Sequence, residues 1–329
     1  MYPAGRASQP NVSPSKGAKL NFAHFSDYSQ RMDQAMITQV RRFNRIVTLR
    51  VGALNNRFLA RDGSLGESRV LWEIGADGRD VRSLRTQLEL DSGYLSRMLR
   101  SLEASGLITV TPSASDKRVR IARLTPSGTA ERAVLDRRSD ELAASLLAPL
   151  NAKQRGRLVD AMAEVERLLN ASMVEIGAID PAHPHAQYCL HMYFSELDRR
   201  FDAGFDPAKS ISADNQELRR PAGLLLVATL RGEPIGCGAL KFHDDRPTEI
   251  KRMWVDETAR GLGLGRRLLN LLENGAASHG AKAVRLETNM TLVEAISLYR
   301  SAGYVEVPAF NDERYAHHWF EKQLSQGSR

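Results

Sequence analysis

The chain has 329 residues, of which 42% are hydrophobic, and this length and composition predict a globular protein of two domains. Its two cysteines, Cys189 and Cys237, are too few for a disulfide framework, and no apolar run reaches transmembrane length. These counts argue against a disulfide-stapled secreted protein or a membrane-spanning protein, and we expect a cytoplasmic location.

The net charge of +7 is unevenly distributed along the chain. Residues 1–170 hold 27 Lys and Arg against 18 Asp and Glu, a balance of +9, whereas residues 171–329 hold 19 against 21, a balance of −2. This asymmetry indicates a nucleic-acid-binding module joined to a different domain, with a solvated charged surface as the alternative. We expect residues 1–25, rich in Pro, Ser, Gly and Ala, to be a disordered tail.

Three helical segments follow the tail. Apolar residues recur every three or four positions from about residue 26 to residue 60, which predicts a long helix. Two short helices are expected at 68–74 and, after Asp80, at 81–88.

A further helix is expected at 92–102, after a turn at 89–91. Its apolar face is formed by Leu95, Met98, Leu99 and Leu102. Off that face lie Tyr94, Ser96, Arg97 and Arg100, which suit base edges and phosphates in a major groove. A short helix, a turn and a cationic helix together indicate a helix-turn-helix.

A β-hairpin with a basic tip is expected next. Its strands are 106–110 and 119–124, and the loop between them carries Lys117 and Arg118, which could enter an adjacent minor groove. Two helices should follow at about 129–148 and 151–170.

Residues 30–168 resemble the MarR family of winged-helix regulators. The resemblance rests on the strings Leu90–Arg100 and Leu102–Ile108, the pattern Asp116-x-Arg118, and Leu124–Gly128. It implies a homodimer on a near-palindromic DNA operator, formed by residues 26–170, with Arg118 in the minor groove and Asp116 orienting it. An ordinary charged hairpin, and an intrachain core for the helix leucines, are the alternatives. The implied DNA contacts are Ser92, Tyr94, Ser96, Arg97, Arg100, Asp116, Lys117 and Arg118.

The second half alternates strands and helices. We expect strands at 172–179, 223–230, 235–242, 248–255 and 283–288, helices at 186–201, 265–279 and 293–301, and two terminal strands near 304 and 318–321. This order predicts a mixed α/β domain over residues 172–325.

A glycine-rich loop from Arg260 to Gly265 separates the strand at 248–255 from the next helix. Its alternating glycines let the backbone approach a ligand, and the following helix N-terminus favours an anion. Arg266 occupies the position where a dinucleotide fingerprint requires glycine, and the Gly-Lys-Ser/Thr ending of a P-loop is absent. A flexible turn is the remaining alternative.

Residues 173–324 resemble the GNAT acetyltransferases. The resemblance rests on the loop, on Glu249–Asp256, on Leu286–Asn289, and on Ala295–Tyr299 with Gly303-Tyr304. It implies acetyl-CoA as the co-substrate, its pyrophosphate on the loop and its pantetheine arm near Met253, Val255 and Asn289. The implied cofactor-binding residues are Met253, Trp254, Val255, Arg260, Gly261, Leu262, Gly263, Leu264, Gly265, Arg266 and Asn289.

The same resemblance assigns two catalytic residues. Glu249 is the expected general base, with a pKa raised by burial. Tyr299 is the expected donor of a proton to the CoA sulfur. The structural alternatives are an edge or salt-bridged glutamate, to which Lys251 and Arg252 are close enough in sequence to be partners, and a packed tyrosine.

The acceptor site is the least defined part of the sequence. Acidic and aromatic residues suit a small primary amine or an amino acid, and no His/Cys cluster has metal-ligand spacing, so no metal is expected. The candidates are Phe205, Asp206, Asn311, Tyr315 and His317, and more weakly His191, Tyr193, Asp202, Phe310 and Trp319.

The sequence therefore predicts a DNA-binding transcription regulator fused to an N-acetyltransferase, associated with the nucleoid when it is bound to DNA. Two alternatives stay open. The second domain could only sense CoA or an effector, or the winged helix could serve only dimerisation.

Overall fold

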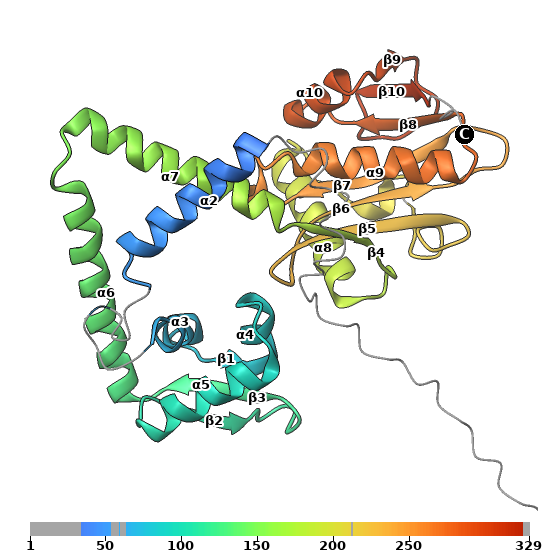
Figure 1. Ribbon diagram of the computed structural model, residues 1–329. Coiled ribbons are helices and arrows are strands. Elements are labelled where there is room, and N and C mark those ends of the chain that lie inside the picture. Colours follow the sequence, from blue (N-terminus) through green and yellow to red (C-terminus); the bar gives the residue numbers. More distant parts are fainter. Residues whose placement is uncertain (1–33, 54–58, 60–63, 212, 325–329) are drawn as a thin grey trace, which may run out of the picture.

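The computed structural model describes residues 34–53, 59, 64–211 and 213–324. A winged-helix region and an α/β region are connected by the long helices α6 (Pro126–Leu147) and α7 (Ala152–Ser172), which bend so that the two regions lie side by side (Figure 1). In the described ranges, no helix combines the length and the apolar character needed to cross a membrane.

The winged-helix region contains three helices and a small sheet. The helices are α3 (Leu65–Ile74), α4 (Val81–Gln87) and α5 (Ser92–Ala104), and the sheet has the order β1-β3-β2, with β1 at Arg79–Asp80, β3 at Arg120–Leu124 and β2 at Ile108–Pro112. Ser64, Asp80 and Asp91 cap the three helices by accepting backbone N–H bonds. The sequence predicted the hairpin and missed β1, which is too short to show periodicity.

Helix α2 (Gln34–Arg50) buries none of its residues. Its large apolar side chains Met36, Val40, Phe43 and Val47 are 38–63% exposed. The predicted helix over 26–60 was too long at its C-terminal end, because a turn at 51–53 with Gly52 at φ 68° follows Arg50. Residues 26–33, 54–58 and 60 lie outside the described ranges.

The α/β region is built on a seven-stranded sheet of order β4-β5-β6-β7-β8-β10-β9. The strands are β4 (Glu175–Ala178), β5 (Gly223–Leu230), β6 (Glu233–Lys241), β7 (Thr248–Val255), β8 (Ala283–Thr288), β9 (Val305–Val307) and β10 (His318–Gln323). Each neighbouring pair is antiparallel except β7 and β8. The parallel ladder joins Thr248 to Val284 and Glu249 to Arg285. Beyond these pairs β7 and β8 separate.

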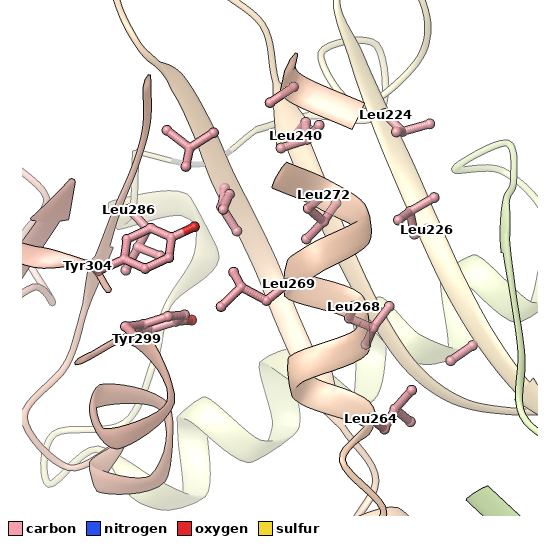
Figure 2. Packing of buried hydrophobic residues seen from close by; sticks show 14 of the residues in the cluster. Leu224, Leu226, Leu240, Leu264, Leu268, Leu269, Leu272, Leu286, Tyr299 and Tyr304 are labelled. Carbon is pink, nitrogen blue, oxygen red and sulfur yellow. The ribbon is translucent and has the colours of Figure 1, made fainter. Parts of the chain in front are cut away.

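Two helices cover opposite faces of this sheet. Leu224, Leu226 and Leu240 pack with α9 (Leu264–Ser278), through Leu268, Leu269 and Leu272 (Figure 2). The alternate residues Leu225, Val227 and Ala239 pack with Ala186 and Cys189 of α8 (Pro184–Arg200). Helix α10 (Val293–Ser301) contributes Ile296 and Tyr299 to the first of these cores. Strand alternation thus forms two separate cores.

Candidate functional site

A cavity of about 520 Å³ lies where β7 ends, between α8, the start of α9 and α10. Most of the predicted cofactor residues line it: Met253, Trp254, Val255, Arg260, Gly261, Gly263, Leu264, Gly265 and Arg266. Leu262 is not among its lining residues and packs against the α9 core, and Asn289 lines a second, smaller cavity. We call the first cavity the loop cavity.

The loop backbone has the geometry of an anion cradle. Gly261 and Gly263 adopt φ values of 78° and 73°, a left-handed conformation that favours glycine. Gly263 is the N-cap of α9, and no side chain caps that helix end. The first N–H groups and the positive end of a 15-residue helix therefore face the cavity. These residues fit a pyrophosphate.

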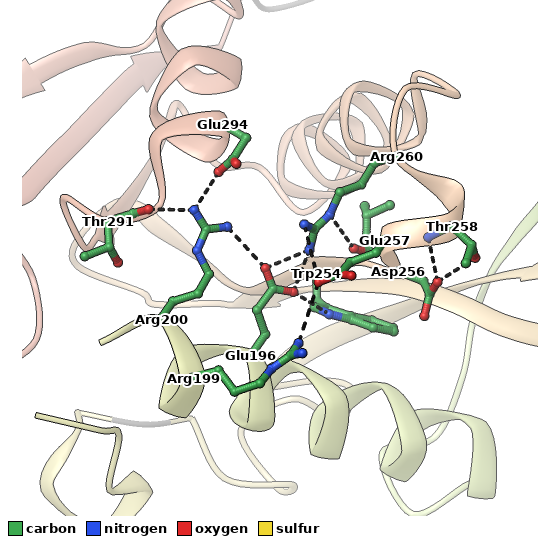
Figure 3. Close-up of polar contacts among 11 residues, drawn as sticks. Glu196, Arg199, Arg200, Trp254, Asp256, Glu257, Thr258, Arg260, Thr291 and Glu294 are labelled. Atoms are coloured by element: carbon green, nitrogen blue, oxygen red, sulfur yellow. Dashed lines mark hydrogen bonds and ion pairs between the residues drawn. The ribbon is translucent and has the colours of Figure 1, made fainter. Parts of the chain in front are cut away.

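Arg260 does not offer a free charge to this cradle. Its Nη2 lies 2.7 Å from both carboxylate oxygens of Glu196, which also accepts a 3.0 Å bond from Trp254 Nε1 (Figure 3). Arg200 donates to Glu196 at 3.3 Å and to Glu294 at 2.8 Å, and so links α8 to α10 across the cavity. The sequence analysis missed Glu196 and Arg200, whose i,i+4 spacing on a helix was the available signal.

Tyr299 lies where the two cavities meet. Its side chain is buried and lines both of them. Burial raises the pKa of Tyr299 well above its usual value, followed by the effect of nearby Tyr193 and Glu287. The hydroxyl therefore stays protonated at neutral pH and can donate a proton.

The environment of Glu249 differs from the expected one. Burial alone would raise its pKa, but the charge of Lys251 and hydrogen bonds from Arg285 and Lys251 lower the pKa of Glu249 to about 2. Arg285 lies 2.8 Å away, Lys251 3.1 Å, and His243 3.3 Å. The predicted rise in pKa is wrong. The glutamate is salt-bridged, as the structural alternative proposed. Lys251 is one of the two partners considered for it, and Arg285 and His243 take the place of Arg252. Glu249 is also absent from the lining of both cavities.

The smaller cavity, of about 90 Å³, lies where β7 and β8 separate. We call it the strand cavity. It shares six lining residues with the loop cavity: Tyr193, Leu197, Met253, Leu292, Ala295 and Tyr299. A thioester arm in one cavity and an acceptor in the other would therefore meet beside Met253 and Tyr299.

The predicted acceptor residues are only partly brought together. Phe205 and Tyr315 line the strand cavity with ring centroids 4.8 Å apart, and Tyr193 lines it too. Asp206, Asn311 and His317 do not line it, and neither do the weaker candidates His191, Asp202, Phe310 and Trp319. Asp206 instead caps a short 3₁₀ helix at Pro207–Lys209, Asn311 accepts a bond from Trp319 Nε1, and the His317 backbone N–H donates to Thr288.

Charged residues that the sequence analysis did not assign to the acceptor line the strand cavity. They are Lys251, Arg252, Glu287 and Glu313. Lys251 donates to Glu287, whose Oε2 is buried without a hydrogen-bond partner. Asn289 donates to the Tyr315 carbonyl at 2.7 Å and accepts from the Thr291 N–H at 2.9 Å, so its amide holds the cavity wall. Nowhere in the described part of the chain do His, Cys, Asp and Glu gather as a metal site.

The winged-helix region exposes its predicted contacts. Ser92, Tyr94, Ser96, Arg97 and Arg100 are exposed on α5, while Leu95, Met98, Leu99 and Leu102 are buried beneath them. At the hairpin tip Lys117 is exposed, and the 87% exposed Arg118 side chain donates to both Asp116 oxygens at 3.1 and 3.2 Å. These bonds lower the pKa of Asp116 and orient the guanidinium outward. The DNA contacts themselves stay a prediction.

Comparison with known proteins identifies two families. The model of the acetyltransferase (GNAT) family matches residues 190–304, and that of the MarR family matches residues 64–119. An IAA acetyltransferase of Azospirillum brasilense is 38% identical over 112 residues, which are 34% of this chain and 73% of that protein.

Two further matches cover one region each. The uncharacterized HTH-type transcriptional regulator YdgJ of Bacillus subtilis is 25% identical over 95 residues, 29% of this chain and 58% of that protein. A crystal structure of a GNAT-family acetyltransferase from Staphylococcus aureus covers 46% of this chain and all of that chain, at 17% identity and a TM-score of 0.41. With the loop cavity, the exposed winged helix and the family matches in agreement, the chain belongs to the GNAT acetyltransferase family, and its N-acetyltransferase domain follows a MarR-family domain.

Proposed function

We propose that the protein is a DNA-binding transcription regulator that also acetylates a small primary amine from acetyl-CoA. The observation that carries the proposal is the junction of the two cavities at Met253 and Tyr299. A thiol-release assay over amino acids, polyamines and peptides tests it, and release no faster than without an acceptor would leave only a CoA-sensing role.

Different residues of the chain bind acetyl-CoA and donate the proton that the reaction requires. Acetyl-CoA supplies the acetyl thioester. The N–H groups of the loop and of α9 hold its pyrophosphate, and the backbone of residues 253–255 holds the thioester arm. Tyr299 donates a proton to the departing sulfur.

For the proton of the acceptor ammonium we propose Glu287 in place of Glu249. Glu287 lines the strand cavity and has an oxygen without a partner, whereas the carboxylate of Glu249 is held by Lys251 and Arg285 outside the cavity lining. Glu249 then acts by holding Lys251, which in turn orients Glu287.

The DNA-binding half of the proposal is supported by the exposed apolar residues of α2 and α7. Helix α2 has no buried residue, and α7 exposes Val159, Met162, Leu168 and Leu169 by 49–56%. Apolar faces of this extent support a homodimer, in which two α5 helices would read neighbouring half-sites. Retention of genomic DNA fragments that weakens as salt rises tests this, and a dimer without DNA retention would favour a purely dimerising winged helix.

A coupled function is favoured by contacts between the domains. Arg167 of α7 donates to the carbonyl of Gly261 in the loop, and Arg267 of α9 donates to the carbonyls of Ala171 and Val174 at 2.8 and 2.9 Å. We infer that acetyl-CoA, by ordering the loop, shifts α7 and thereby changes DNA affinity.

Operator affinity with and without acetyl-CoA tests this coupling, together with the reciprocal change in acetyl-CoA affinity when DNA is added. Arg167→Gln should reduce both changes equally, because linkage is reciprocal. Lys153→Gln, on the same helix and exposed, is the control. Equal operator affinity with and without acetyl-CoA would remove the coupling and leave both separate activities standing.

A further inference from the structure

We propose that the acceptor bears a carboxylate, as an amino acid does, and that Arg252 binds it. This deepens the proposed acetyl transfer and rests on it. The starting observation is that Arg252 is 7% exposed and lines the strand cavity. Its Nη2 donates one 3.3 Å bond to the Ala213 carbonyl, and its guanidinium stacks on Phe194 at 4.6 Å.

The charge of Arg252 lacks an anionic partner. Within the described ranges, no carboxylate lies within 4.0 Å of it. The other two buried cations are both paired, Lys251 with Glu249 and Glu287, and Arg285 with Glu249. Burying a charge without a counter-ion is unfavourable, and a carboxylate bound in the cavity would relieve that cost.

The backbone geometry of β7 directs the side chain of Arg252 towards the strand cavity. Arg252 has φ 59°, a left-handed conformation that is rare for a residue with a side chain, and it lies where the β6–β7 register shifts between Cys237 and Ala239. Such an irregularity re-aims one side chain out of the strand alternation. The guanidinium of Arg252 therefore reaches the cavity wall and the rings of α8.

The remaining charges of the cavity suit the amine. Glu313 is already occupied, because its oxygens accept from Ser210 Oγ at 2.8 Å and from the backbone N–H groups of Ile211 and Tyr315 at 2.6 and 3.2 Å. Glu287 keeps one oxygen without a partner. One unpaired cation and one unpaired carboxylate oxygen complement a zwitterion, with the carboxylate at Arg252 and the ammonium towards Glu287.

The cavity size restricts the acceptor further. Its volume of about 90 Å³ is below the roughly 150 Å³ of an engineered cavity that holds benzene. The aromatic walls from Phe201, Phe205 and Tyr315 leave little room for a large side chain. Small amino acids are therefore the first acceptors to test.

Matched acceptors test the proposal. Glycine and alanine are compared with methylamine and ethylamine, which lack only the carboxylate, in thiol release by the full-length protein. We expect kcat/KM for the amino acids to be higher by about 100-fold or more, because a buried polar group left unpaired discriminates strongly. Equal values would overturn the inference, while the acetyltransferase proposal would stand.

Two variants locate the effect. Arg252→Met should lower kcat/KM for alanine by about 100-fold, mainly through KM, and lower kcat/KM for ethylamine much less. Arg252→Lys should lose less of the activity on alanine because it keeps the charge. Thermal melting checks that both variants fold. Calorimetric titration of alanine into the CoA-saturated protein gives a readout without turnover. Binding that Arg252→Met abolishes supports the inference even if no amine is acetylated, and binding that neither variant weakens overturns it.

Discussion

The two halves of the molecule place their charges in opposite ways. In the described part of residues 34–170, Ser68 is the one buried polar residue, and Arg97, Arg100 and Arg118 stand in solvent. Among the described residues after 170, six charged residues are buried: Glu196, Glu249, Lys251, Arg252, Arg285 and Glu313. Exposed charge attracts a polyanion over a distance and is screened by salt. Buried charge acts at short range in a low dielectric, where it fixes geometry. This difference fits the DNA recognition proposed for the first half and the acetyl transfer proposed for the second.

We expect the largest effect from Glu287→Gln, which should reduce acetyl transfer by the second half without affecting DNA binding by the first. Loss of a general base lowers kcat by about 10²–10⁴-fold and leaves DNA retention unchanged. Thiol release and DNA retention on the same preparation measure both. Glu249→Gln is the matched control. It should lower kcat less than Glu287→Gln does, when kcat is calculated per folded enzyme. The reverse order at equal folding would restore Glu249 as the base.

Two leucines sharpen the contrast between the packed and the exposed surfaces. Leu268 is 0% exposed in the α9 core, so Leu268→Ala should lower the free energy of unfolding by about 2–5 kcal/mol. Leu168 is 55% exposed on α7, so Leu168→Ala should cost less than about 0.5 kcal/mol in the monomer. Denaturant titrations at several protein concentrations measure both. A concentration-dependent cost for Leu168→Ala would show that a second copy covers it.

Acid should destabilise the second half first. The folded-state pKa of Glu249, about 2, lies below its ordinary 4.5, so its stabilisation is present above pH 4.5 and is lost as the pH falls towards 2. That shift corresponds to about 3 kcal/mol. Hydrogen exchange between pH 5 and pH 2.5 should show β7 losing protection before α5. Glu249→Gln should flatten this pH dependence, and loss of protection in α5 first would contradict the contrast.

The smallest effect is expected at the hairpin tip. Arg118→Ala should weaken DNA binding by about tenfold and reduce the slope of log affinity against log salt by about 1, because one phosphate-neutralising charge is lost. Acetyl transfer should not change. Arg137→Ala, exposed on α6, serves as the comparison. If the slope of log affinity against log salt does not change, Arg118 does not contact a DNA phosphate.

Local signals in the sequence predicted much of this structure. The helix starts after Asp80 and after the turn at 89–91 depend on neighbouring residues, and so do the two strands β5 and β6 with their turn and the glycines of the loop. The pKa of Glu249 could not be predicted in this way, because Arg285 arrives from the next strand, 36 residues later. The residues that line the acceptor site could not be predicted for the same reason. Its wall combines α8, β7, β8 and the loop before β10, and only tertiary packing decides which of their side chains face one cavity.

The hydrogen bonds from Arg167 and Arg267 limit where this chain can be truncated without loss of the acetyltransferase fold. A truncation that begins at β4 would remove Arg167 and the carbonyl of Ala171, and the start of α9 would lose partners that hold it beside the loop. A protease that cleaves between α7 and β4 would have the same effect. The shortest fragment that keeps the acetyltransferase intact should therefore begin inside α7, ahead of Arg167, so the connecting helix belongs to both domains.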